Sequence, residues 1–255
     1  MSRTGPRFKD HFSGHAANYA RFRPRYPETL FAAIRGHAPA PAPALALDCA
    51  TGNGQLALGL AGFCERVIAT DASAEQLQSA ISHPQIEYRV APAEDSGLAP
   101  ASIDLLTVGQ ALHWFDHARF AAEVERVIAP GGLLVCVSYA NCRVNPEIDA
   151  AVAPLYVDIL DAYWPPEREL VETRYSTIDL PGADVDFPAL TVTKVWDVEA
   201  MLGYLRTWSA SKRYEQDRGR DPVSIVEARL REAWGEGELR VEWPLTVRAT
   251  RLGAG

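Results

Sequence analysis

One short stretch, residues 46–55, constrains the fold of this chain more than any other. It reads Ala-Leu-Asp-Cys-Ala-Thr-Gly-Asn-Gly-Gln, so an apolar segment leads directly into two closely spaced glycines, and a second apolar segment follows at residues 56–60. Glycine adopts backbone conformations that other residues resist, and it lets the backbone approach a ligand closely. The stretch therefore predicts a buried strand, a tight turn and a helix, an arrangement that suits a nucleotide-like ligand at the edge of a sheet.

Strand and helix patterns alternate through the first 140 residues. Alternation at this spacing is typical of βαβ units, whose strands lie parallel in one sheet. With two later strands added, we expect a doubly wound α/β fold with a mostly parallel, seven-stranded sheet and functional side chains along the carboxyl ends of its strands. The predicted strands are residues 45–48, 66–71, 86–90, 103–108, 133–137, 189–197 and 240–251, and the early helices are 28–36, 56 to just beyond 60, 74–81 and 116–128.

The rest of the chain is expected to complete a single domain of 255 residues. Residues 1–40 form an N-terminal helical cap, in which an aromatic-rich helical stretch at 7–26 precedes a Pro/Ala linker that cannot be helical. The cofactor-binding core spans residues 44–140. Residues 142–235 have a less regular pattern and form a partly inserted lid, with helices expected at 145–162, 198–211 and 222–234. The last segment, 236–255, carries the final strand.

The charge of the chain narrows the possible partners. The net charge is −8 and the pI is about 5.3, whereas a groove for nucleic acid usually carries a basic stripe. Residues 1–35 depart from this balance, because they hold seven Arg or Lys residues against two acidic ones. That segment either binds an anionic ligand or is a solvated, arginine-rich entry to the domain. Nucleic acid is not an expected partner.

Neither a membrane nor a metal ion is expected. The N-terminus lacks an apolar signal core, and no apolar run approaches the length that spans a bilayer. The four cysteines, Cys49, Cys64, Cys136 and Cys142, form no CxxC pair and no metal-ligand spacing. Unpaired cysteines of this kind are typical of a reducing compartment, so we expect a cytoplasmic protein.

A carboxylate ends the second predicted strand. Asp71 follows Gly54 by 17 residues and can accept hydrogen bonds from the two hydroxyls of a ribose, as in dinucleotide sites. It could instead cap the next helix, although Ser73 is the better candidate for that cap. A dinucleotide fingerprint has a third glycine three positions after Gly54, where this chain has Ala57. Because small residues are sometimes tolerated there, these residues leave both NAD and an adenosyl ligand open.

A distinctive run follows the fourth predicted strand. Residues 108–116 read Val-Gly-Gln-Ala-Leu-His-Trp-Phe-Asp, and residues 126–135 read Arg-Val-Ile-Ala-Pro-Gly-Gly-Leu-Leu-Val. Together with the stretches 19–27, 163–165 and 203–210, this order resembles the class I S-adenosylmethionine-dependent methyltransferases. Its details resemble the type 11 small-molecule branch, which includes trans-aconitate-methyltransferase-like proteins. The resemblance covers nearly the whole chain and implies a Rossmann-like methyltransferase fold with S-adenosylmethionine as the cofactor.

The resemblance also implies which residues hold that cofactor. Asp71 would bind the ribose hydroxyls, Ala72 would pack on the adenine, and Ala93 and Glu94 would lie at its edge. This chain has Pro92 where the broader family often has an aspartate, so the contact to the adenine amino group falls on Glu94, Asp95 or the backbone. Gln110 would touch the cofactor through its backbone. The remaining assignments are Asp48 and the Gly52 and Gly54 backbone at the methionine portion, Ala50 and Gln55 as further cofactor-binding residues, and Tyr19 and Arg23 closing over the cofactor.

His113 is the candidate for chemistry on the substrate. An ordinary histidine pKa of about 6.5 allows either a general base or a ligand for a substrate anion, and the alternative is a structural histidine. Four aromatic residues either line the substrate pocket or pack the lid: Trp114, Trp164, Tyr204 and Trp208.

The predicted activity is methylation of a small molecule, with O-methylation of a carboxylated metabolite as the working hypothesis. One alternative is an NAD(P)-dependent Rossmann oxidoreductase, although no Tyr/Lys or His/Asp proton relay is found. Another is a non-catalytic cofactor-binding domain, because a fold does not establish a function. The sequence leaves the oligomeric state undetermined.

Overall fold

The computed structural model describes residues 24–253. The predicted helix at residues 7–26 falls mostly outside this range, and so do Tyr19 and Arg23. The first described helix, α2 (Glu28–His37), matches the predicted helix that begins at Glu28.

Five parallel strands form the centre of the sheet. They lie in the order β3 (Ile86–Val90), β2 (Arg66–Asp71), β1 (Leu45–Cys49), β4 (Ile103–Gly109) and β5 (Ile128–Tyr139). The antiparallel β8 (Leu239–Arg251) and the two-residue β6 (Ala183–Asp184) complete the order beyond β5. The predicted doubly wound, mostly parallel sheet of seven strands is confirmed. An eighth strand, β7 (Thr191–Trp196), pairs with β8 outside this order.

The strand order reverses between β1 and β4. From β1 the chain continues outward through β2 and β3, and it then returns to the other side of β1 to form β4 and β5. Ligands of open α/β sheets bind at such a switch point, beyond the carboxyl ends of the strands. The fold therefore places the expected site at the ends of β1 and β4.

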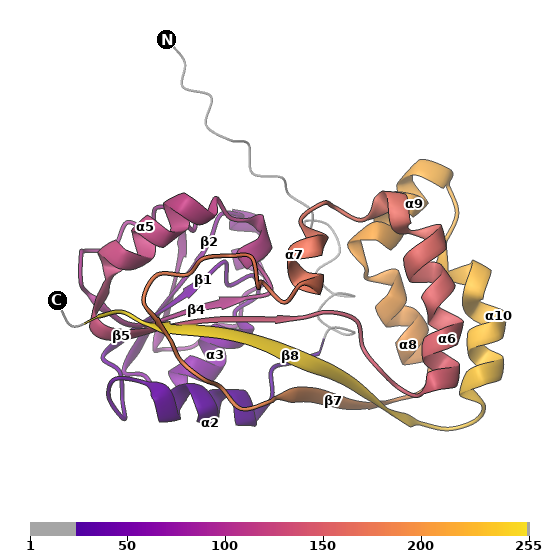
Figure 1. The fold of residues 1–255 in the computed structure, drawn as a ribbon, viewed down its shortest axis with the longest axis horizontal. Coiled ribbons are helices and arrows are strands. Elements are labelled where there is room, and N and C mark those ends of the chain that lie inside the picture. Colours follow the sequence, from indigo (N-terminus) through magenta and orange to yellow (C-terminus); the bar gives the residue numbers. More distant parts are fainter. Residues whose placement is uncertain (1–23, 254–255) are drawn as a thin grey trace, which may run out of the picture.

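Helices cover both faces of the sheet (Figure 1). On one face, α2 and α3 (Gln55–Ala61) pack through Leu30, Leu56 and Leu60 against alternate residues of the strands. On the other face, α5 (His117–Val127) packs through Phe120 and Val124. A fourth helix beside the sheet, α4 (Ala74–Gln78), is shorter than the predicted 74–81. Strands that are buried on both faces carry apolar residues on both, which is why the sequence shows continuous apolar runs here.

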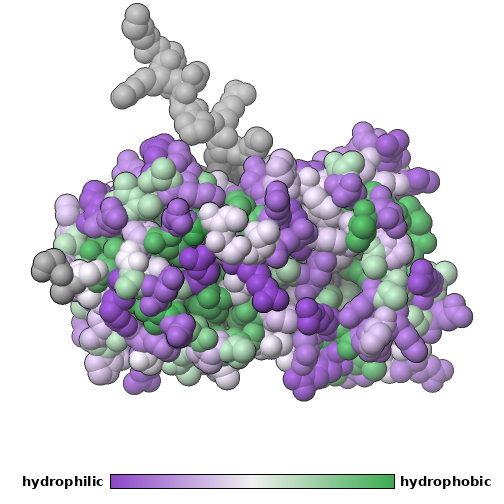
Figure 2. All heavy atoms as spheres, viewed as in Figure 1, coloured by the Kyte–Doolittle hydropathy of each residue, from purple (hydrophilic) through white to green (hydrophobic). Residues whose placement is uncertain are grey.

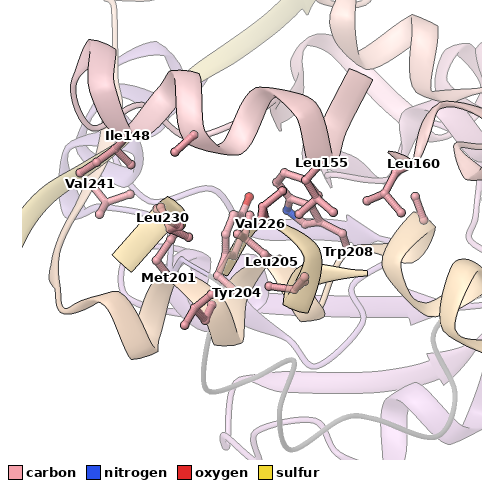
Figure 3. Packing of buried hydrophobic residues seen from close by; sticks show 14 of the residues in the cluster. Ile148, Leu155, Leu160, Met201, Tyr204, Leu205, Trp208, Val226, Leu230 and Val241 are labelled. Atoms are coloured by element: carbon pink, nitrogen blue, oxygen red, sulfur yellow. The ribbon is translucent and has the colours of Figure 1, made fainter. Parts of the chain in front are cut away.

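A second group of helices lies beside the sheet, and we call it the helical module (Figure 1). Its hydrophobic core is separate from the two clusters on the faces of the sheet and includes Tyr204 and Trp208 (Figure 3). The fully buried Trp243 belongs to the same core. The Trp243 indole N–H donates a hydrogen bond to the Tyr204 hydroxyl at 3.1 Å. The module consists of α6 (Pro146–Pro154), α8 (Val198–Arg206), α9 (Ser209–Arg218), α10 (Val223–Trp234) and β7.

The long strand β8 joins the two parts. Its residues 239–244 pair with β7, and residues 245–251 pair with β5. A short helix, α7 (Arg168–Glu172), lies between the sheet and the helical module (Figure 1). On the face shown in Figure 2, hydrophilic residues dominate. Hydrophobic residues are exposed there in separate areas, over the sheet and over the helical module. Among the described residues, no helix combines the length and the hydropathy that crossing a bilayer requires.

Three further predicted elements differ from the structure. The predicted helix at 198–211 is two helices, because Trp208 is extended (ψ 137°) and its ring turns into the module core. The α-helical part of the predicted 145–162 helix ends at Pro154, and a wider π-helical turn follows at Leu155–Ile159. The turn predicted at Pro130–Gly132 lies inside β5, where Gly131 has a φ of 81°.

Candidate functional site

The turn after β1 carries three residues with positive φ: Ala50 at 54°, Gly52 at 57° and Gly54 at 86°. A Cβ on Gly54 would lie 2.3 Å from the Tyr88 hydroxyl, so both the backbone and the available space require glycine there. Around Gly52 the nearest atom to such a Cβ is 4.0 Å away, so the backbone is open on that side. A left-handed conformation at a residue with a side chain, as at Ala50, is a form of strain that clusters at functional sites.

Asp48 supports this turn from inside the core. Its carboxylate is 1% exposed and accepts hydrogen bonds from the Thr51 hydroxyl at 2.5 Å, the Thr107 hydroxyl at 2.8 Å and the Ala57 N–H at 3.1 Å. Burial raises the pKa of Asp48 to about 6, although these three hydrogen bonds act in the opposite direction. The contact of Asp48 with the cofactor stays a prediction, whereas its support of the turn is a feature of the structure.

Asp71 ties the same turn to the end of β2. One carboxylate oxygen accepts the Gly52 N–H and the other accepts the Ser73 N–H, both at 2.9 Å. The Ser73 hydroxyl caps α4 by accepting the Gln76 N–H at 3.3 Å, so Asp71 is not that side-chain cap. Asp71 therefore lies beside the glycine turn, a position that is compatible with binding a ribose.

The other predicted cofactor residues lie around this turn. Ala72 is exposed at the end of β2. Ala93 is partly buried against the hydrophobic cluster between the sheet and α5. Glu94 accepts the Asp116 N–H at 2.9 Å and so links the loop after β3 to the start of α5. The side-chain oxygen of Gln55 is buried and accepts no hydrogen bond from the described residues. Buried polar atoms normally have a partner, so this oxygen fits a site completed by a ligand.

Gln110 joins the ends of β4 and β5. Its N–H donates to the Val137 carbonyl at 2.8 Å, and its side-chain amide both donates to and accepts from the Tyr139 backbone, at 3.0 and 2.8 Å. The φ of Gln110 is 53°, so Gln110 is, after Ala50, the second non-glycine residue near the switch point with a strained backbone. The predicted backbone contact to the cofactor cannot use the Gln110 N–H, because Val137 already accepts it.

A cleft opens beyond the carboxyl ends of β4 and β5, against the helical module. Its volume is about 620 Å³, counting the part that is open to solvent. The structure brings together there six of the residues predicted from the sequence: Gln110, His113, Trp114, Trp164, Tyr204 and Trp208. The first three come from the end of β4 and the turn after it. The last three come from the opposite wall, where Trp164 precedes α7, Tyr204 is in α8 and Trp208 lies between α8 and α9. The candidate substrate pocket is therefore built by both parts of the fold.

His113 lies in this cleft but is 8% exposed. Its Nδ1 is 2.9 Å from the hydroxyl of Tyr175, which follows α7. Burial lowers the pKa of His113 to about 3, and the positive charge of Arg168 acts in the same direction. The ordinary pKa assumed from the sequence was therefore wrong. At neutral pH the imidazole is neutral, and it is a weak base that can still form a hydrogen bond in the cleft.

Sequence reasoning missed Arg168, which also lines the cleft. Its guanidinium donates from Nε to the Tyr156 hydroxyl at 2.9 Å and from Nη2 to the Asn141 side chain at 3.1 Å. It lies over the Trp164 ring at 5.1 Å. The signal available in the sequence was a cation just after the helix break at Trp164-Pro165-Pro166. Tyr175 was missed as well, because no local pattern connects it to a histidine 62 residues away.

Comparisons with known proteins show the family of the chain. A family model described as a methyltransferase domain matches residues 47–136. A Dictyostelium discoideum protein named as a methyltransferase is 30% identical over 234 residues, which cover 91% of this chain and 89% of that protein. The chain belongs to the methyltransferase family.

Solved structures extend the comparison. A structure from Anaeromyxobacter dehalogenans, described as a type II methyltransferase, is 47% identical with a TM-score of 0.84 and covers 91% of this chain and 99% of its own. A structure from Anabaena variabilis, described as a methyltransferase from an antibiotic biosynthesis pathway, has a TM-score of 0.55 at 19% identity and covers 88% and 98% of the two chains. At that identity the likeness shows the fold alone.

The matched methyltransferase domain begins in β1 and ends within β5. It includes Asp48, the glycine turn, Asp71 and His113. The far wall of the cleft in this methyltransferase, with Trp164, Arg168 and Trp208, lies outside the matched residues.

Proposed function

We propose that this methyltransferase uses S-adenosylmethionine to methylate the carboxylate of a small acid. The observation that carries the proposal is that the glycine turn and the aromatic cleft lie side by side along the same edge of the sheet. The glycine turn and Asp71 lie at the ends of β1 and β2, and the aromatic cleft lies at the ends of the neighbouring β4 and β5. A cofactor at the first pair of strands therefore lies next to an acceptor at the second pair.

The residues around the glycine turn fit an adenosyl cofactor. The backbone is open at Gly52, the Gln55 oxygen is buried without a described donor, and Asp71 offers a carboxylate for the ribose hydroxyls. In a dinucleotide fingerprint the third glycine position packs the helix against the strand, and alanine is accepted there. That position is Ala57, which is fully buried and whose N–H is bonded to Asp48, so it does not discriminate between the two cofactors. The methyltransferase family of the chain is what favours S-adenosylmethionine over NAD(P).

The state of His113 favours an acceptor that needs no base. When bound, the cofactor supplies a methyl group on a sulfonium, and an acceptor oxygen forms the new C–O bond as the C–S bond breaks and its electron pair stays on sulfur. A hydroxyl acceptor must also lose a proton, which an imidazole with a pKa of about 3 removes poorly. A carboxylate has no proton to lose and becomes a neutral ester. His113 then serves as a hydrogen-bonding ligand in the cleft, and the aromatic side chains there exclude water.

The proposal extends to the setting of the enzyme. The resemblance to the trans-aconitate-methyltransferase-like branch supports a small acidic substrate, as does the basic balance of residues 1–35. The four cysteines are free, which suits a reducing compartment, and we propose the cytoplasm. Neither nucleic acid nor a membrane is part of the proposal.

Two measurements test this function in sequence. Calorimetric titration with S-adenosylhomocysteine and with NADH should show binding of the first and none of the second, and the reverse result would overturn the cofactor assignment. Transfer of a labelled methyl group from S-adenosylmethionine to a panel of small acids, amines and phenols should then give base-labile methyl esters. Binding without turnover on any acceptor would favour a non-catalytic domain, and turnover only on amines would refute the carboxylate.

A further inference from the structure

The charge of the cleft differs from that of the whole molecule. The chain carries a net charge of −8, yet the twelve described residues that line the cleft include no carboxylate. They include one permanent cation, Arg168, and a histidine that burial keeps neutral. A cation in a largely aromatic cleft whose lining holds no carboxylate favours a ligand with one negative charge.

Arg168 is held in position by its own contacts. Its side chain is 16% exposed. The bonds from Nε to the Tyr156 hydroxyl and from Nη2 to Asn141 fix the plane of the guanidinium, and the Trp164 ring supports one face of it. A guanidinium fixed in this way loses little conformational freedom when it binds an anion.

The charge of Arg168 is only partly compensated within the protein. The nearest carboxylate, Glu172, is 3.6 Å from Nε, and its side chain is 47% exposed. That carboxylate also accepts a hydrogen bond from the Tyr156 hydroxyl. The remaining nitrogen of Arg168, Nη1, makes no hydrogen bond to any described residue. One end of the guanidinium is thus available to a ligand in the cleft.

The other walls of the cleft are aromatic. Trp164 and Trp208 contact each other with ring centroids 5.6 Å apart, and Trp114 and Tyr204 contribute from the two sides. Such walls favour an apolar, unsaturated ligand body over one that carries several further charges.

We propose that Arg168 selects the acceptor by binding the carboxylate of a monocarboxylic acid with an aromatic or unsaturated body. This inference rests on the proposed function and names the class of acid. Because Nη1 is the available nitrogen, it bonds one carboxylate oxygen and leaves the other to attack the methyl group. Methylation converts the carboxylate into a neutral ester, which removes the charge attraction to Arg168 and favours release of the product.

The test compares an acid with its neutral counterpart of the same shape. The wild-type protein is saturated with S-adenosylhomocysteine and titrated in a calorimeter with trans-cinnamate and, separately, with trans-cinnamamide. We expect the acid to bind at least about tenfold more tightly than the amide. Equal affinities, or no binding of the acid up to about 10 mM, would overturn the proposal. Tighter binding of trans-aconitate than of cinnamate would overturn the choice of a monocarboxylic acid.

Variants assign the effect to Arg168. Arg168→Gln should abolish the preference for the acid, Arg168→Lys should keep part of it, and Arg143→Gln, which changes an exposed arginine outside the cleft, should keep all of it. In turnover, Arg168→Gln should raise KM for the acid while kcat changes by less than KM does. Retention of the full preference by Arg168→Gln would refute the role of this side chain. If a circular-dichroism melt shows that Arg168→Gln does not fold, the wild-type and Arg168→Lys titrations still test the role of Arg168. A preference for the acid that is equal in these two proteins would then refute it.

The two proposals fail in different ways. Failure of S-adenosylhomocysteine to bind the wild type would refute the proposed cofactor. Normal binding of S-adenosylhomocysteine together with equal affinities for cinnamate and cinnamamide would refute only the role of Arg168.

Discussion

Replacing Asp48 with asparagine should change how the stability of the protein depends on pH. Asp48 is buried, and burial raises its pKa from the ordinary 3.8 to about 6 in the folded state. Between these two values the folded protein binds more protons than the unfolded chain. The free energy of unfolding therefore falls as the pH rises through this window. Asparagine has nearly the same shape and does not titrate, so it removes this dependence.

The magnitude follows from the two pKa values. Their difference corresponds to about 3 kcal/mol of stability lost at neutral pH relative to strong acid, of which about 2 kcal/mol falls between pH 4 and pH 7. The asparagine oxygen can still accept the Ala57 N–H, and the Thr107 hydroxyl can turn to accept from the new amide. The substitution can also have a cost that is the same at every pH. Between pH 4 and pH 7 the free energy of unfolding of the variant, relative to that of the wild type, should therefore rise by about 2 kcal/mol.

Urea unfolding followed by tryptophan fluorescence at several pH values between 4 and 7 measures this difference directly. The slopes with urea should be the same for both proteins, so that the midpoints report stability. The surface variant Asp158→Asn controls for the loss of one negative charge and should follow the wild type. Parallel stability curves for wild type and Asp48→Asn would refute the raised pKa of Asp48.

Three further outcomes are expected. Asp71→Ala should weaken S-adenosylhomocysteine binding by ~1–3 kcal/mol in a calorimeter, because a charged acceptor is lost, and an unchanged affinity would retire the ribose assignment. Gly54→Ala should lower the free energy of unfolding by at least ~1–2 kcal/mol, since φ is 86° and the Cβ would meet the Tyr88 hydroxyl. Tyr88→Phe should restore only the steric part of that loss in urea unfolding, whereas unchanged stability of the single variant would contradict the geometry. The His113 ring should stay neutral in an NMR titration down to about pH 4, because burial lowers its pKa to about 3. A midpoint near 6.5 would show instead that the ring is solvated.

The sheet was the most predictable part of the fold. The predicted bounds of β2 and β3 match the structure residue for residue, and β1 and β4 differ by one residue at one end. The inner strands β1, β2 and β4 are buried on both faces and are mainly apolar, whereas the edge strand β3 alternates apolar and polar residues. Both patterns are local, so the local sequence decides these strands. The break between α8 and α9 was not predictable in this way. It depends on Trp208 turning into a core whose other members come from distant segments, and tertiary packing there overrides helical periodicity.

The chemistry of the site depended even more on distant residues. The sequence placed His113 after β4 correctly, but its pKa is lowered by burial and by the nearby Arg168 and His117. The contact of the Gln110 backbone with the cofactor stays a prediction, and the bond of its side-chain amide to the backbone of Tyr139 on the neighbouring strand was not visible in the sequence. Residue type and spacing identify which side chains reach the sheet edge, whereas their protonation and free donors depend on what the rest of the chain packs against them.

The two walls of the cleft are supported by different hydrophobic cores. The residues that determine the class of reaction can therefore vary independently of those that select the substrate. The wall at β4 belongs to the sheet whose residues 47–136 match the methyltransferase domain. The opposite wall belongs to the helical module and α7, which lie outside that match and which β8 fixes to the sheet by pairing with both β5 and β7. Changes in the module core can therefore reshape the acceptor side while the glycine turn, Asp48 and Asp71 stay in place. Relatives that share the sheet alone should consequently share the methyl donor, and only those that also keep a cation at the position of Arg168 should share the preference for a carboxylate.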